Sequence, residues 1–227
     1  MQLQKHKLKL LSWNLIASPF NNATSLIHDN DNRLSKIIKV IHKEGADVVL
    51  LQDVMKDEYK ELKHEFPQYD ASVLQKSFWN KKNNNTDEID IGLVEMVNKN
   101  SFNSIIFKNN IVYLRKENVS MKIGNIQLDD ASSIKRLKQL NDMLLKMSDV
   151  SHSIIAGNFN TDIQIDNYNK CIYDPIYLIE KKSTFDNMFY VGFRLNQIRS
   201  SHSYLDEMMI NCKTKIKHSP IVSQFEF

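Results

Sequence analysis

Cysteine and glycine are scarce in this chain of 227 residues, which holds two cysteines and five glycines. Cys171 and Cys212 form neither a CxxC pair nor a zinc-ligand spacing, which argues against a metal knuckle and against a dense disulfide framework. Apolar runs long enough to span a bilayer are lacking. Residues 1–11 are basic and then briefly apolar, without the small-residue cleavage site of a signal peptide. We therefore expect an intracellular protein, cytoplasmic or nuclear, with no membrane span.

Excess charge is lacking too, because 30 Lys and Arg residues face 27 Asp and Glu residues, for a formal net charge of +3. Overall charge therefore names no partner, whether nucleic acid or membrane. With 42% hydrophobic and 25% charged residues, the composition lies in the ordinary globular range. Length and composition predict one domain over residues 1–227. They leave the oligomeric state open.

Helical periodicity is present in three segments. In 33–44 the apolar residues recur at i, i+3, i+4 and i+7, and Gly45 is placed to end the helix. A second, short helix carries Tyr59, Leu62 and Phe66 and is closed by a proline. A third helix is expected from about residue 132, capped by Asp129 or Asp130, with one apolar side that faces the core: Ile134, Leu137, Leu140, Leu144 and Met147.

Short apolar runs predict many strands between these helices. Their ranges are 8–13, 47–52, 153–157, 204–211 and 221–227, together with a β-meander formed by 91–97, 104–108, 111–115 and 121–128. Many short strands with few amphipathic helices predict an α/β fold in which two mainly antiparallel sheets pack face to face with helices outside.

Five segments in fixed order carry a family resemblance: LLSWN at 10–14, ADVVLLQDV at 46–54, IGNIQL at 123–128, IIAGNFN at 154–160 and KHSPI at 217–221. The endonuclease/exonuclease/phosphatase superfamily typically reads WN, LQE, THL or SHL, GDFN or GDTN, and SDH at these places. The chain resembles this superfamily over nearly its whole length. Within it, QLDD followed by RLKQLNDMLLKM is similar to the 5′-tyrosyl-DNA phosphodiesterase branch.

The resemblance implies a four-layered, DNase I-like α/β sandwich and, in active relatives, metal-dependent hydrolysis of a phosphate ester. If this chain is active, it implies Mg²⁺ or Mn²⁺ as cofactor; if it is not, no cofactor is required. Asn14 and Asn160 match two asparagines of the family motifs and keep their capacity to donate hydrogen bonds to a phosphate. Asp53 stands where the family has its metal-binding glutamate, with an arm shorter by one methylene.

Other positions of the family's catalytic set are changed. Asn158 replaces the aspartate of GDxN, and a carboxamide neither accepts a proton from water nor neutralises a cation. Gln127 replaces the histidine of THL, so a group that titrates near neutrality is lost. His218 matches the histidine of SDH, but Lys217 stands where the orienting aspartate belongs. Asp206 matches the aspartate of a late FDRI-like segment, in altered surroundings.

Each position also has a plain structural explanation. Asn14 and Asn160 suit turns after strands, because asparagine tolerates left-handed backbone. Asp53 and His218, taken singly, are a strand-end carboxylate and a surface histidine. With three catalytic roles replaced, we expect a pseudoenzyme that keeps the fold as a binding or scaffolding module for nucleic acid or protein. The alternative is an active Mg²⁺-dependent phosphodiesterase with a rearranged site.

Overall fold

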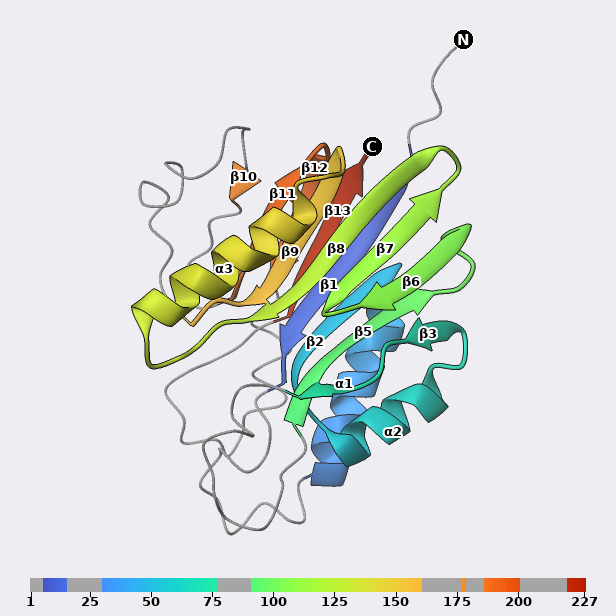
Figure 1. The fold of residues 1–227 in the computed structure, drawn as a ribbon. Coiled ribbons are helices and arrows are strands. Elements are labelled where there is room, and N and C mark those ends of the chain that lie inside the picture. Colours follow the sequence, from blue (N-terminus) through green and yellow to red (C-terminus); the bar gives the residue numbers. More distant parts are fainter. Residues whose placement is uncertain (1–5, 16–29, 77–90, 161–176, 179–185, 201–219) are drawn as a thin grey trace.

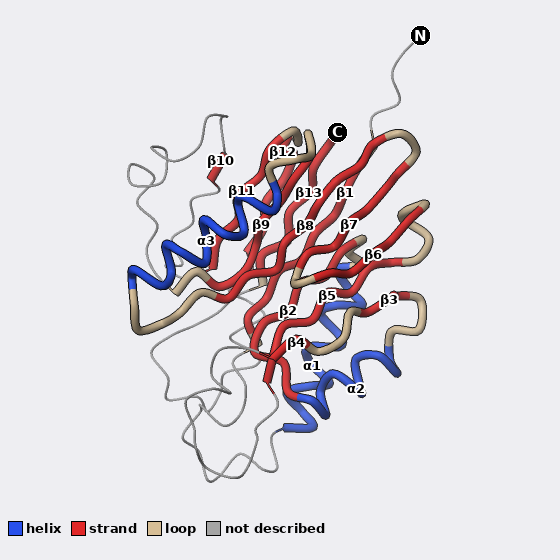
Figure 2. The backbone as a smooth tube through the Cα atoms, viewed as in Figure 1, coloured by secondary structure: helices blue, strands red, loops and turns tan. Residues whose placement is uncertain are grey.

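The computed structural model describes residues 6–15, 30–76, 91–160, 177–178, 186–200 and 220–227, and shows two β-sheets packed face to face between helices (Figures 1 and 2). Each sheet contains one parallel pair of strands, β1–β2 in one and β8–β9 in the other, and the remaining pairs are antiparallel. The predicted architecture of two mainly antiparallel sheets flanked by helices is confirmed.

The first sheet has seven strands in the order β12-β13-β1-β2-β5-β3, and β4 also pairs with β5. Its strands are β1 (Lys7–Asn14), β2 (Val48–Met55), β3 (Tyr69–Ala71), β4 (Gln75–Lys76), β5 (Ile91–Asn98), β12 (Arg194–Ser200) and β13 (Ile221–Glu226). The second sheet has six strands in the order β10-β11-β9-β8-β7-β6. They are β6 (Ser104–Lys108), β7 (Ile111–Lys116), β8 (Val119–Gln127), β9 (His152–Asn158), β10 (Tyr177–Leu178) and β11 (Asp186–Val191).

The helices cover the outer faces of the sheets. α1 (Asn30–Glu44) and α2 (Lys56–Glu65) lie on the first sheet, where Ile37, Ile41 and Leu62 pack against Leu11 and Trp13 of β1. α3 (Ser133–Met147) lies on the opposite side of the molecule, on the second sheet (Figure 1). Burial of one apolar stripe of each helix therefore holds four layers together.

Gly45 ends α1 as predicted. Its backbone is left-handed, with φ of 51°, and its N–H donates to the carbonyl of Ile41 at 3.0 Å. Glycine adopts this conformation without the steric cost that a Cβ atom would add.

The apolar side of α3 differs from the prediction. Leu140, Met143 and Met147 are buried against the second sheet, whereas Ile134 is 81% exposed and Leu137 is 43% exposed. The prediction is thus confirmed for Leu140, Leu144 and Met147 and wrong for Ile134 and Leu137, because periodicity does not tell how far along the helix the contact with the sheet extends. Its N-cap is Ser132, whose side chain accepts a hydrogen bond from the Lys135 N–H, rather than Asp129 or Asp130.

The predicted meander is also divided. β6, β7 and β8 form a meander in the second sheet, but β5 pairs with β2, β3 and β4 in the first. Strand β5 and strand β6 are close in sequence and lie in different layers. The predicted strand 204–211 lies outside the described residues.

Candidate functional site

The layer between the sheets is apolar at one end and polar at the other. Along each central strand every second side chain points into this layer, so the change can be followed strand by strand. In β1, Leu8 and Leu10 give way to Ser12 and Asn14, all of them buried. Buried polar residues of other strands complete the polar end: Gln52 in β2 and Glu95 in β5 of the same sheet, and Asn125 in β8 and Asn158 in β9 of the facing sheet.

Asp53 lies at this polar end, inside β2 rather than at its end as the sequence predicted. The pairing of β2 with β5 shifts between Leu51, opposite Val94, and Val54, opposite Gly92. Two residues of β2 therefore oppose one of β5, which is a β-bulge. Asp53 has a left-handed φ of 55°, an unusual and costly conformation for a residue with a Cβ atom. The bulge turns its carboxylate towards the second sheet.

Gln127 is the hydrogen-bond partner of the Asp53 carboxylate. Its Nε2 group donates to Oδ1 of Asp53 at 2.6 Å, so a hydrogen bond joins the last residue of β8 to the bulge of β2 across the two sheets. The Oε1 atom of Gln127 is buried and has no hydrogen-bond partner among the described residues. Two positions predicted from separate motifs are thus in direct contact.

Asn158 and Asn160 adjoin this pair. Gln127 and Asn158 are register partners in the parallel pair β8–β9. Oδ1 of Asn158 accepts a hydrogen bond from the Asn160 N–H at 2.9 Å, and Nδ2 of Asn160 donates to the carbonyl of Leu128 at 2.6 Å. Asn160 has φ of 51°. The turn explanation for Asn160 therefore applies.

Asn14 is buried at the end of β1 and pairs in register with Gln52, the residue before Asp53. The chain beyond it is fixed by two contacts: the Leu15 N–H donates to the Gln52 carbonyl at 2.9 Å, and Arg33 of α1 donates to the Leu15 carbonyl. The structure thus brings Asn14, Asp53, Gln127, Asn158 and Asn160 to one end of the inter-sheet layer. Their functional roles stay predictions.

A buried hydrogen-bond network lies behind these residues and is not part of the five motifs. Asn125 of β8 accepts a hydrogen bond from Gln52 at 2.8 Å, and its Nδ2 group lies 3.0 Å from Oε1 of Glu95. Glu95 is fully buried, and its Oε2 atom has no partner among the described residues. Burial raises the pKa of the Glu95 carboxyl, because a charged carboxylate is poorly solvated there. A glutamate inside the apolar run IGLVEMV was the available signal.

The fit of a magnesium ion can be judged from the donors present. Mg²⁺ prefers six oxygen ligands at about 2.0–2.1 Å, and its protein ligands are usually one or two carboxylates. Asp53 offers a carboxylate whose Oδ1 already accepts a hydrogen bond from an amide. Asp129 uses Oδ1 to accept from the N–H groups of Ala131 and Ser132, at 3.0 and 2.8 Å, in the turn before α3. One oxygen of each carboxylate is therefore engaged within the protein, and a cation would have to compete for it or use the other oxygen.

Two predicted site residues, His218 and Asp206, lie outside the described residues, as does Lys217.

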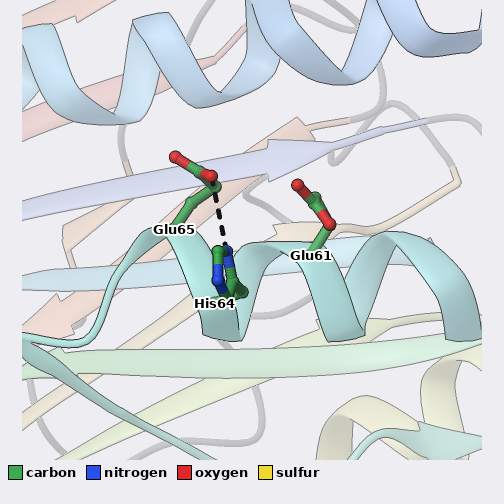
Figure 3. Close-up of side chains that lie close together, drawn as sticks. All are labelled: Glu61, His64 and Glu65. Atoms are coloured by element: carbon green, nitrogen blue, oxygen red, sulfur yellow. Dashed lines mark ion pairs between the residues drawn. The ribbon is translucent and has the colours of Figure 1, made fainter.

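A second group of metal-ligand types lies on the surface of α2. Oxygen and nitrogen atoms of Glu61, His64 and Glu65 fall within 4.8 Å of one another, and His64 Nδ1 is 3.5 Å from Glu65 Oε1 (Figure 3). All three side chains come from one helix, and Glu61 and His64 are exposed. This arrangement is that of an ordinary solvated helix face, where acidic side chains gather without an ion.

Comparison with solved structures identifies the fold. TDP2 of D. rerio, complexed with single strand DNA product, matches with a TM-score of 0.69 and 14% identity over 96% of this chain and 98% of that chain. The endonuclease/exonuclease/phosphatase from Bacteroides vulgatus matches with a TM-score of 0.69 and 12% identity over 98% and 99%. ANGEL2, a 2′,3′-cyclic phosphatase, in complex with adenosine-2′,3′-vanadate, matches with a TM-score of 0.67 and 14% identity over 99% and 97%.

No protein-family model and no curated protein matches the sequence. The structural matches nevertheless confirm the resemblance inferred from the five motifs: the chain has the DNase I-like fold of endonuclease/exonuclease/phosphatase proteins. Among the described residues, no helix has the length and apolar character needed to cross a membrane.

Proposed function

We propose that this chain is a pseudoenzyme, a non-catalytic module that binds a phosphate ester of a nucleic acid at the polar end of its inter-sheet layer. The observation that carries the proposal is the 2.6 Å hydrogen bond from Gln127 to Asp53. In this arrangement the carboxylate that active relatives would give to a metal is satisfied within the protein. The residue that satisfies it stands where those relatives have a histidine.

The neighbouring groups support binding rather than hydrolysis. Asn14 and Asn158 are neutral carboxamides, which donate hydrogen bonds to phosphate oxygens but do not activate water. Charge-neutral donors suit an anionic ligand without requiring a cation beside it. A nucleic acid is favoured over a protein ligand because TDP2 carries a DNA product and ANGEL2 an adenosine derivative on the same fold.

The experiment measures binding and hydrolysis on the same protein. Fluorescence anisotropy with a 5′-phosphorylated single-stranded oligodeoxynucleotide is expected to show saturable binding in the presence of a chelator. Asn158→Leu should weaken it, and Leu145→Ser, on the exposed side of α3, should not. Incubation with a 5′-tyrosyl oligonucleotide and Mg²⁺ should give no turnover. Turnover that Asp53→Ala abolishes would overturn the proposal.

The second candidate is an active, metal-dependent phosphodiesterase. It is favoured by one observation: the carboxylate of Asp53 is retained at the end of the layer where Asn14 and Asn158 also lie. The paired restoration Asn158→Asp and Gln127→His separates the candidates. If the parent protein is a pseudoenzyme, the double substitution should create Mg²⁺-dependent hydrolysis that the parent protein lacks. If the parent protein is an active phosphodiesterase, it hydrolyses the substrate before substitution, and the double substitution only changes the rate.

A further inference from the structure

Asn125 makes an unusual set of contacts for a side chain buried between two sheets. It belongs to β8 of the second sheet, yet its Nδ2 group lies 3.0 Å from the carbonyl oxygen of Leu51 and 3.2 Å from that of Val94, both in the first sheet. Leu51 and Val94 are register partners in the pair β2–β5, immediately before the register shifts at the bulge. The carboxamide of Asn125 therefore reaches across the layer to the backbone of β2 at Leu51 and of β5 at Val94, the last register pair before the bulge.

The bulge needs such support for a physical reason. A β-bulge disrupts the ladder locally and leaves backbone groups for other partners, and an unpaired buried carbonyl is costly. Asp53, within the bulge, has φ of 55°, and a non-glycine residue keeps this conformation only when its surroundings determine it. The NH₂ group of Asn125 brings two donors within reach of three acceptors, the carbonyls of Leu51 and Val94 and Oε1 of Glu95. Its own Oδ1 accepts from the Gln52 side chain at 2.8 Å. Gln52 is the residue directly before Asp53.

Two successive inward side chains of β8 thus bind two successive residues of β2. Asn125 is bonded to Gln52, and Gln127, two residues later on the same face, is bonded to Asp53. Asn125 is fully buried, so it is not available to touch a ligand itself. Any influence on the site must pass through the position of the bulge.

We propose that Asn125 is a positioning residue: by holding the backbone of β2 and β5 across the inter-sheet layer, it fixes the bulge that directs Asp53 to Gln127. For ligand binding this inference rests on the proposed function, since it deepens the account of the same site. The positioning itself does not depend on which ligand binds there.

The test compares Asn125→Leu with Ile123→Ala. Leucine keeps the branched shape and the four heavy atoms of the asparagine side chain, is somewhat larger, and removes the hydrogen bonds. Ile123 lies two residues earlier on β8, on the same face, in the apolar part of the layer, so its truncation destabilises the protein without touching the bulge. Nitrogen-15 labelling of glutamine, in side chain and backbone, and of aspartate, in its backbone amide, allows the Gln127 NH₂ signals and the Asp53 amide signal to be followed by NMR.

Asn125→Leu is expected to move the Gln127 NH₂ signals and the Asp53 amide signal, and Ile123→Ala is expected to leave them in place. The same leucine variant should bind the 5′-phosphorylated oligonucleotide about tenfold more weakly, the loss expected from one misplaced hydrogen bond. Unmoved signals in Asn125→Leu, or equal movement in Ile123→Ala, would show that Asn125 serves general stability alone.

A substitute variant and the independence of the NMR measurement keep the outcome decisive. If Asn125→Leu does not fold, Asn125→Thr takes its place, because threonine suits a strand and lacks the amide donors. If the unsubstituted protein binds no oligonucleotide, the proposed function fails, and the NMR comparison still decides whether Asn125 positions Asp53.

Discussion

Gln127 and Asp53 lie on different sheets and are joined by a hydrogen bond of 2.6 Å between Nε2 and Oδ1. A histidine at position 127 would bring a group that titrates near neutral pH, whereas glutamine brings a permanent neutral donor. The donor at position 127 therefore does not change with pH. It also competes with any cation for the oxygen that accepts it.

Removing the donor should expose the carboxylate to metal ions. Gln127→Leu leaves Asp53 Oδ1 without this bond, so we expect Mn²⁺ affinity, measured by titration calorimetry, to rise about tenfold, the equivalent of one net hydrogen bond. The double substitution Gln127→Leu with Asp53→Asn should return the affinity to that of the parent. A rise that survives the second substitution would place the added metal away from Asp53.

Gly157 should be intolerant of any side chain. Its φ is 146°, and a Cβ atom built there would lie 2.0 Å from the carbonyl oxygen of Ile126 on the neighbouring strand. We expect Gly157→Ala to lower the free energy of unfolding by about 3 kcal/mol or more, because backbone must move to relieve the clash. Urea denaturation measures the loss.

Gly45 provides the matched control for this substitution. Its φ of 51° also disfavours a side chain, but the nearest atom to a built Cβ is 3.9 Å away, at the carbonyl oxygen of His42. Gly45→Ala should therefore cost only the conformational part, about 1 kcal/mol. Similar losses at both positions would mean that the close approach of β8 and β9 at Gly157 is not rigid.

The strands around the site could be predicted from sequence because their apolar runs are unbroken. Residues 8–13 lie within β1, and the predicted run 47–52 begins one residue before β2 and otherwise lies within it. Both runs deliver polar residues to the same end of the first sheet. The position of Asp53 could not be predicted in this way. A bulge is a property of the pairing of two strands, and the run before Asp53 reads as a strand that simply ends there.

The buried network escaped prediction for a related reason. Motif comparison directs attention to strand ends, whereas Glu95 and Asn125 lie within strands whose other residues are mostly apolar. Asn125 and Gln127 are two residues apart, so they share a face, and this pattern could have indicated a polar contact across the layer. Which residues of the other sheet they meet depends on how the sheets stack, and the sequence does not encode that in any local pattern.

Two residues of the predicted apolar side of α3 should differ sharply in their contribution to stability. Leu140→Ala is expected to lower the free energy of unfolding by about 2–5 kcal/mol, because Leu140 is fully buried in the cluster under the helix. Ile134→Ala, at an exposed position predicted from periodicity to be core, should change it by less than about 0.5 kcal/mol. Urea denaturation of both variants checks this. A large loss for Ile134→Ala would mean that the helix is rotated about its axis in solution.

Glu95 should make the protein less stable as the pH rises. Burial raises the pKa of its carboxyl above the ordinary value of 4.5, so the folded state holds a proton that the unfolded chain releases. Folded protein therefore binds more protons than unfolded protein at pH values between 4.5 and the raised pKa. The contribution of Glu95 to stability is complete below the ordinary value and is lost as the pH rises through the window, by up to about 1.4 kcal/mol per pH unit.

Glu95→Gln removes this titration and keeps an oxygen that can accept the hydrogen bond from Asn125. We expect its free energy of unfolding, measured by urea denaturation across a pH series, to fall less with rising pH than that of the parent protein, so that the difference between the two grows in favour of the variant. Glu61→Gln is an exposed substitution of the same chemical kind on α2. Its free energy of unfolding should depend on pH as that of the parent protein does. If the free energy of unfolding of Glu95→Gln shows the same pH dependence as that of the parent protein, the Glu95 carboxyl is ionised in the folded protein. It must then be stabilised by something other than its described neighbours.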